Sequence, residues 1–152
     1  MSEPRKMSIN EFQGNVRLRS QERGTYKTGS ALNEALMAIA GLGLLADYAV
    51  KNRQHEMRPV IGGIMESLVN VAHMEGVQIG EVDRYRAAKR TTAAQGVAFI
   101  SIMLAELPVS TQPGAPRHPM PVLRDSVTSL AALATMVGST LEECCAIAWT
   151  KS

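Results

Sequence analysis

One helical pattern occurs twice in this 152-residue chain, at a constant offset of 62 residues between positions 58 and 120 and without a gap. RPVIGGIMESLVNVAHMEG (58–76) aligns with MPVLRDSVTSLAALATMVG (120–138), and the two segments share Pro59/Pro121, Val60/Val122, Ser67/Ser129, Leu68/Leu130, Ala72/Ala134, Met74/Met136 and Gly76/Gly138. Chance alignment of two amphipathic helices is the alternative explanation. A single offset that also matches the loop glycines favours internal duplication, and units this small must pack together to bury their apolar faces.

The spacing of apolar residues predicts helices throughout and no strand of useful length, so the predicted fold class is all-α. Capping boxes at Ser8/Glu11 and Thr140/Glu143 predict two helix starts, and glycines predict the helix ends near 76 and 138. Pro59 is expected at a helix start, a shorter helix is expected to reach Arg90, and 108–121 is expected to be a loop. We expect one compact domain: an N-terminal helix and loop (1–30), a first repeat (31–90) and a second repeat (91–152).

Two predicted helices, 31–51 and 92–107, are apolar on nearly every side. Helices of that kind are usually central in a bundle, so we expect both in the interior. They also leave more apolar surface than two small units can cover, which predicts a homo-oligomer.

Composition and charge exclude several classes of protein. A net charge of +2 is too small to indicate nucleic acid or a membrane surface as partner, and 4% aromatic residues disfavour stacking on single-stranded nucleic acid. Cys144 and Cys145 are adjacent, which gives neither a disulfide framework nor metal-ligand spacing. The stretch from Ala93 to Leu107 is too short for a bilayer and contains Glu106, and the first residues lack a signal core. We therefore expect a cytoplasmic protein.

The order of these motifs resembles the MazG-like nucleoside triphosphate pyrophosphohydrolases of the all-α pyrophosphatase superfamily. INEFQGNVRLRS (9–20) is similar to the start of short bacterial and phage members, and ALMAIAGLGLLADYAVK (35–51) to the family helix ALxGLxGEAGELADxVK. VIGGIMESLVNVAHMEG (60–76) resembles ELGDVLWYLxxLAxxxG, while 79–90 and 141–151 resemble LEEVxxxNLxKL. The resemblance implies a MazG-like helical bundle of two tandem repeats of about three helices plus an N-terminal helix, of phage or prophage origin.

The family's chemistry depends on four carboxylates, E-x-x-E on one helix and E-x-x-D on the next. This spacing puts both acids of a helix on one face, where they bind the Mg²⁺ that activates water against the triphosphate. At the equivalent positions, the first repeat has Gly41, Leu44, Val60 and Gly63, and the second has Met103, Glu106, Val122 and Asp125. Mg²⁺ is thus the cofactor if the chain is active, with Glu106 and Asp125 as its remaining ligands. The alternatives are a helix-end acid near Pro108 for Glu106 and a first-turn acid for Asp125.

Two further groups are candidates. Glu66, Asn70 and His73 share a helical face after Gly62 and Gly63, which predicts either the wall of a pocket, with Glu66 as a substitute acid, or tight helix packing beside a solvated face. Glu34 and Asp47 lie on the neighbouring predicted helix and are further substitute acids. The resemblance also aligns Lys89 and Lys151 with the family's lysine and Arg86 with a position close to the nucleotide. These three residues are the candidate phosphate ligands, and a solvated basic surface is the alternative.

Three functions follow from these observations. The first is a catalytically lapsed protein that binds a nucleotide or related phosphorylated small molecule, as a sensor or a sequestering protein. The second is an active pyrophosphohydrolase that uses Glu106, Asp125 and a substitute acid such as Glu66. The third is a protein-interaction module. The missing acids disfavour the second, and the basic residues favour the first over the third.

Overall fold

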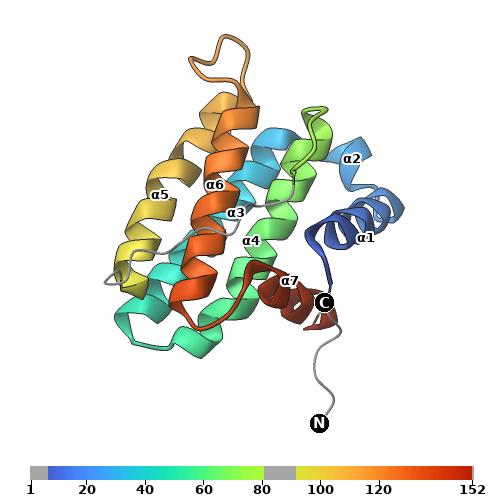
Figure 1. Ribbon diagram of the computed structural model, residues 1–152. Helices are drawn as coiled ribbons and strands as arrows, with labels where there is room; N and C mark the ends of the chain where they lie inside the picture. The colour runs from blue at the N-terminus through green and yellow to red at the C-terminus, as the bar shows by residue number, and fades with distance from the viewer. Residues whose placement is uncertain (1–6, 81–91, 152) are drawn as a thin grey trace.

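A computed structural model describes residues 7–80 and 92–151, and these residues form seven helices and no strand (Figure 1). The all-α class predicted from the sequence is confirmed. The helices are α1 (Ile9–Glu22), α2 (Thr25–Thr28), α3 (Ala31–Val50), α4 (Gln54–Met74), α5 (Ala93–Ser110), α6 (Pro119–Met136) and α7 (Leu141–Lys151).

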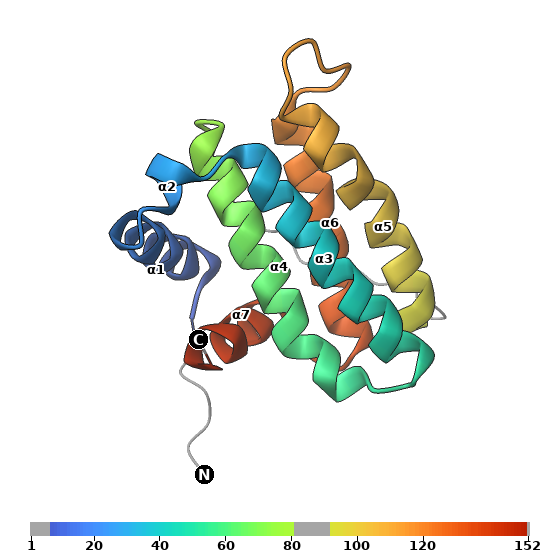
Figure 2. The same cartoon turned by 180° about the vertical axis from the view of Figure 1, so that it is seen from behind.

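The helices α3 to α6 form a four-helix bundle. The helix α3 packs against α4 and α5, and α6 packs against the same two helices. Each neighbouring pair in the bundle is antiparallel (Figures 1 and 2). The helices α1 and α7 pack across the outer side of α4, so α4 is enclosed by other helices.

The helix α4 is therefore the centre of the molecule. The helical spacing of Ile61, Ile64, Met65, Leu68 and Ala72 predicts one apolar stripe, and all five side chains are buried, as is Met57. The expectation that the two most apolar helices lie in the interior is wrong. In α3 only Ala35, Ala38 and Leu45 are buried, because α3 is at a corner of the bundle and nothing that the structure describes covers its outer side.

The predicted helix starts agree with the capping geometry. Ser8 Oγ accepts a hydrogen bond from the Glu11 amide at 3.0 Å, and Thr140 Oγ1 accepts one from the Glu143 amide at 3.1 Å. At the helix ends, Gly76 and Gly138 have φ angles of +70° and +75°, the left-handed conformation that glycine adopts most easily.

Prolines mark helix boundaries less well than expected. The helix α4 begins at Gln54, so Pro59 lies inside it. Proline has no backbone N–H to donate to the carbonyl of His55, and the Arg58 side chain donates to that carbonyl instead. Likewise, α5 continues through Pro108 to Ser110, and α6 begins at Pro119, so the predicted loop is shorter. A short helix, α2, lies within the segment predicted as the first loop. The helix predicted to end near Arg90 lies outside the described residues.

Two of the four corresponding helix boundaries repeat with the sequence offset, whereas the end of α3 and the start of α4 differ from it by two and three residues. The first residues of α3 and α5, Ala31 and Ala93, are 62 positions apart, and so are the last residues of α4 and α6, Met74 and Met136. Duplication of an ancestral helix pair would give this correspondence.

Two helices, α3 and α5, are long and apolar enough to cross a membrane, judged by length and composition alone, and the bent pair α6 and α7 would make a third. We expected 93–107 to be too short for a bilayer because the helix was predicted to end at Leu107. The helix α5 instead continues to Ser110 and has 18 residues. Length therefore does not decide between a membrane-bound and a cytoplasmic protein.

Candidate functional site

The two acids that remain at the aligned metal positions are brought together by the fold. Glu106 lies in the second half of α5, and Asp125 lies in the second turn of α6, which packs alongside. Arg117, in the loop between these helices, lies between the two carboxylates. Its Nη1 donates to Glu106 Oε2 at 2.5 Å, and its Nη2 donates to Asp125 Oδ2 at 3.2 Å.

This ion-pair cluster of Glu106, Arg117 and Asp125 is half exposed, with 41–48% of each side chain open to solvent. The hydrogen bonds to Glu106 and then to Asp125 raise the pKa of Arg117, so the guanidinium stays charged at every physiological pH. One positive charge thus offsets two negative ones at the positions where the family would bind a cation. Sequence analysis did not identify Arg117, because a lone arginine in a proline-rich loop resembles an ordinary surface residue.

The first-turn alternative for Asp125 is wrong, whereas Glu106 is a half-exposed acid close to the end of its helix, as its alternative supposed. Asp125 is the seventh residue of α6, too far from its N-terminus to be a first-turn acid. Glu106 lies four residues before the end of α5, because that helix continues through Pro108. The positions of both acids instead favour the interhelical pairing through Arg117.

The residues around Glu106 and Asp125 do not fit a magnesium site. Within the described part of the chain, no group of three or more His, Cys, Asp or Glu side chains could hold a metal ion. Mg²⁺ prefers near-octahedral oxygen ligands, and two carboxylates already bonded to a guanidinium offer little to replace its waters. We therefore derive no reaction step through Mg²⁺.

Among the aligned positions of the first repeat, Gly41 is a close-packing position, whereas Gly63 is exposed and a Cβ there would meet nothing within 4 Å. A Cβ on Gly41 would lie 2.6 Å from Cγ1 of Ile64, so this glycine permits the close approach of α3 to α4. Leu44 is half exposed, and Val60 is partly buried against the core. Glycine, leucine and valine have no side-chain oxygen, so this half of the bundle cannot bind a cation in the family's manner.

Glu66 lies on α4 and forms an ion pair with α1. Its Oε1 accepts a hydrogen bond from Arg19 Nη2 at 2.7 Å, and the Arg19 guanidinium lies 4.0 Å from the ring centroid of Trp149 on α7. Trp149 in turn meets Phe12 edge to face. Glu66 thus helps to hold α1 and α7 together on α4.

Asn70 is the centre of a buried polar network. Its Oδ1 accepts hydrogen bonds from Ser20 at 2.9 Å and from Tyr26 at 2.8 Å, and its Nδ2 donates to Glu34 at 2.6 Å. His73 is exposed, and its ring stacks on Tyr26 with centroids 4.1 Å apart. The face of Glu66, Asn70 and His73 therefore meets α1 and α2, so these side chains make helix–helix contacts. Of the other acids, Asp47 pairs with Lys51 on the surface.

The candidate phosphate ligands are not described. Arg86 and Lys89 lie outside the described residues, and so does the side chain of Lys151. They stay predictions from the resemblance.

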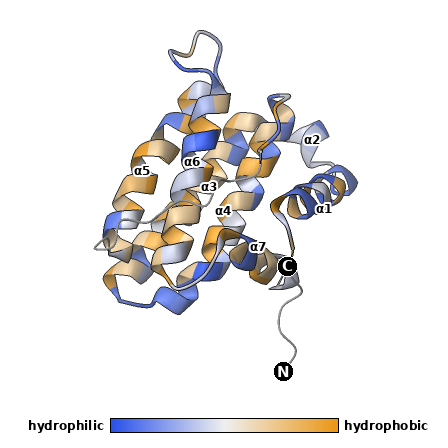
Figure 3. Cartoon of the chain, viewed as in Figure 1, coloured by the Kyte–Doolittle hydropathy of each residue, from blue (hydrophilic) through white to orange (hydrophobic). Residues whose placement is uncertain are grey.

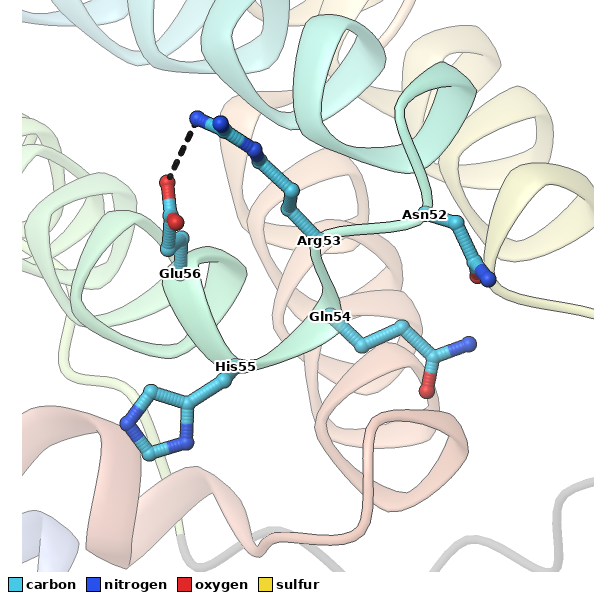
Figure 4. A pocket seen from close by; sticks show the side chains of 5 residues that line it. All are labelled: Asn52, Arg53, Gln54, His55 and Glu56. Atoms are coloured by element: carbon cyan, nitrogen blue, oxygen red, sulfur yellow. Dashed lines mark ion pairs between the residues drawn. The ribbon is translucent and has the colours of Figure 1, made fainter.

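Two depressions lie elsewhere on the described chain. The larger, about 460 Å³, is open and lies at the turn into α4, where Arg53 and Glu56 form an ion pair of 3.5 Å. His55 also lines it, and its ring points away from that ion pair (Figure 4). The smaller, about 110 Å³, lies between α5 and α6 and includes Phe99 and Met103. Its volume is below the roughly 300 Å³ at which small-molecule pockets begin. Neither depression contains a predicted ligand, although Met103 occupies one of the aligned metal positions.

Comparison with family models, with curated proteins and with solved structures found no match to this chain.

Proposed function

We propose that this chain is a catalytically lapsed MazG-like protein of the cytoplasm, which binds a nucleotide or related phosphorylated small molecule without hydrolysing it. The observation that carries the loss of catalysis is the position of Arg117. Where the family resemblance calls for carboxylates around Mg²⁺, a guanidinium bridges the two acids that are left. A sensing or sequestering role suits a protein that keeps a scaffold and loses its chemistry.

Phosphate binding without a metal follows from the same loss. Four carboxylates repel a triphosphate unless a cation offsets them, and most of that repulsion is gone when only Glu106 and Asp125 remain and Arg117 neutralises part of their charge. The candidate ligands Arg86, Lys89 and Lys151 would then contact phosphate directly. Charge-assisted bonds of this kind are strong, and arginine can bind phosphate through two parallel bonds.

Calorimetry in EDTA, with a panel of linear and cyclic nucleotides, tests this proposal. We expect binding without a metal, weakened by added salt because salt screens the charges. Arg86→Ala and Lys89→Ala should each weaken binding several-fold, whereas Lys51→Ala, which removes an exposed cation already paired with Asp47, should leave it unchanged. Absence of binding, or binding insensitive to both substitutions, would contradict the proposal.

The loss of catalysis has its own test. Incubation with ordinary and modified nucleoside triphosphates should release no pyrophosphate above background, and millimolar Mg²⁺ should not raise the melting temperature. Turnover on the order of 1 s⁻¹ would instead establish an active pyrophosphohydrolase. An Mg²⁺-dependent rise in melting temperature that disappears in Glu106→Ala and Asp125→Ala would show a metal site at these acids and would contradict a lapsed site.

A protein-interaction module is the second candidate, favoured by the exposed apolar side of α3 and α5. If no nucleotide binds, that surface becomes the best indication of function.

A further inference from the structure

Arg117 is held at the surface between two helices. Its loop, residues 111–118, stands clear of the bundle and is mostly hydrophilic (Figures 1 and 3). Glu106 of α5 accepts a hydrogen bond from Nη1, and Asp125 of α6 accepts one from Nη2. Carboxylates from two separate helices therefore fix the position of the guanidinium, while 43% of the Arg117 side chain stays open to solvent.

The guanidinium has more donors than these two bonds use. Arginine carries five N–H groups in one rigid plane, and each carboxylate of the cluster accepts a bond from one nitrogen. The other N–H groups belong to a side chain that an oxyanion from solution can reach. A guanidinium that is already held in place loses less freedom on binding, and its paired N–H groups match the spacing of two phosphate oxygens.

The charges around the cluster permit an anion to bind. Two carboxylates alone would repel phosphate, but Arg117 offsets one of them, and Arg124, the exposed residue before Asp125, offsets the other. Arg117 also lies two residues before the start of α6, and that end of a helix is the positive end of its dipole. The bonds that a guanidinium makes to phosphate are therefore not outweighed by repulsion from the two acids.

A guanidinium can also form the link that a metal forms. In the family that the sequence resembles, Mg²⁺ joins protein carboxylates to the triphosphate, and the residues of this chain do not fit Mg²⁺. Arginine bonds strongly to carboxylates and to phosphates, and it has enough N–H groups to do both at once. It is part of the chain, so it needs no ion from solution.

From these observations we propose that Arg117 is a direct phosphate ligand, which takes the place between protein carboxylates and phosphate that the family gives to Mg²⁺. The inference rests on the proposed function, because it concerns the phosphate of the bound nucleotide. It adds a ligand from the described part of the chain to the candidates Arg86, Lys89 and Lys151. The competing explanation is a structural ion pair that only holds the loop against α5 and α6.

Calorimetry in EDTA, with ATP as the probe, tests the inference. Arg117→Ala should weaken binding roughly ten-fold or more, because phosphate loses a charged donor and faces two unpaired carboxylates. Arg53→Ala is the matched control, since Arg53 is also an exposed arginine paired with an acid and lies at the other end of the bundle (Figure 1). The control should bind ATP as tightly as the unmodified chain.

The variant Glu106→Gln separates a phosphate ligand from a structural ion pair. Glutamine still accepts a hydrogen bond from Arg117 but carries no charge, so this variant weakens the ion pair and removes a charge that repels phosphate. If Arg117 binds phosphate, Glu106→Gln should bind ATP several-fold more tightly, whereas Arg117→Ala binds it more weakly. A structural ion pair predicts weaker binding in both variants, because both loosen the loop.

Three results would overturn the inference. The first is an Arg117→Ala chain that binds ATP as tightly as the unmodified chain, and the second is weaker binding in Glu106→Gln. In both cases the proposed function still stands. The third is an unmodified chain that does not bind ATP, and the other nucleotides of the panel then decide whether the proposed function fails as well.

A measurement on the unmodified chain does not depend on the folding of any variant. In side-chain NMR of the arginine Nε–H groups, the Arg117 signal should shift in proportion to bound ATP, and the Arg53 signal should not. An Arg117 signal that stays constant up to saturation with ATP would equally exclude a contact with phosphate.

Discussion

At the scale of the residue, the two cysteines show how burial controls chemistry in this molecule. Cys144 and Cys145 are free, buried thiols in the first half of α7. Burial raises the pKa of Cys144 to about 11, although a contact of 3.7 Å with the Ser139 hydroxyl acts in the opposite direction. Burial also raises the pKa of Cys145. Since thiolates are the reactive form, both residues are structural rather than nucleophilic.

This burial predicts both reactivity and pH dependence. At pH 8 the native thiols should react with a disulfide reagent at least ten-fold more slowly than in urea. The pKa of Cys144 is higher in the folded state, so its contribution to the free energy of unfolding is full below about pH 9 and is lost as pH rises toward 11. The loss is on the order of 2 kcal/mol. Urea titrations across this range measure it.

The control for that experiment is Cys144→Ala, whose stability should fall less steeply between pH 9 and pH 11. An equal slope in both proteins would mean that other groups cause the pH dependence.

At the scale of the element, adjacent glycines on α4 have different roles. A Cβ on Gly62 would overlap the carbonyl oxygen of Cys144 and lie 2.6 Å from Cβ of Ala148, so Gly62 lets α7 approach α4 closely. A Cβ on Gly63 would meet nothing within 4 Å. The sequence left open whether this pair lines a pocket or permits tight packing. Tight packing explains Gly62, and it does not explain Gly63.

Gly62→Ala and Gly63→Ala form a matched pair of variants. Gly62→Ala should lower the free energy of unfolding by about 1–3 kcal/mol, because backbone of α7 has to move. Gly63→Ala should raise it by about 0.5–1 kcal/mol, since alanine is the better helix former. Chemical denaturation measures both. Equal effects of the two substitutions would show that α7 does not pack on α4 at this distance.

At the scale of the whole molecule, the Asn70 network joins parts of the chain that are distant in sequence. Ser20 on α1, Tyr26 on α2 and Glu34 on α3 all bond to this one amide of α4. Asn70 is only 4% exposed, so its partners would lose their bonds in a place that water reaches poorly. The network therefore fixes the N-terminal third of the chain against the bundle.

Asn70→Ala should lower the free energy of unfolding by about 2–3 kcal/mol, because it removes the partner of the buried Ser20 hydroxyl and of the partly buried Tyr26 and Glu34 side chains. Tyr26→Phe removes one of these bonds and should cost about 1 kcal/mol. The double variant should lose less stability than the sum of the two single losses, since both substitutions remove the same hydrogen bond. Full additivity, measured by denaturation, would rule out a shared network.

The sequence by itself determined the elements that depend on local chemistry. Ser8 and Thr140 cap helices because a hydroxyl there can accept from an amide three residues on, and Gly76 ends α4 because it adopts a left-handed conformation easily. The all-α class and the buried stripe of α4 follow from helical periodicity, which is also local. Pro59 and Pro108 led to wrong helix boundaries, because a helix can include a proline where the loss of one backbone hydrogen bond is tolerated.

Only the tertiary structure decided what those elements face. The mean hydropathy of α3 suggests an interior helix, yet α1 and α7 cover α4 instead and leave α3 at the edge. Glu66 and Asn70 share a face with His73 by spacing, but whether that face lines a pocket depends on α1 and α2 packing there. Arg117 joins Glu106 and Asp125 only because a loop folds back between two helices. Contacts between distant residues set these outcomes, and helical periodicity contains no information about them.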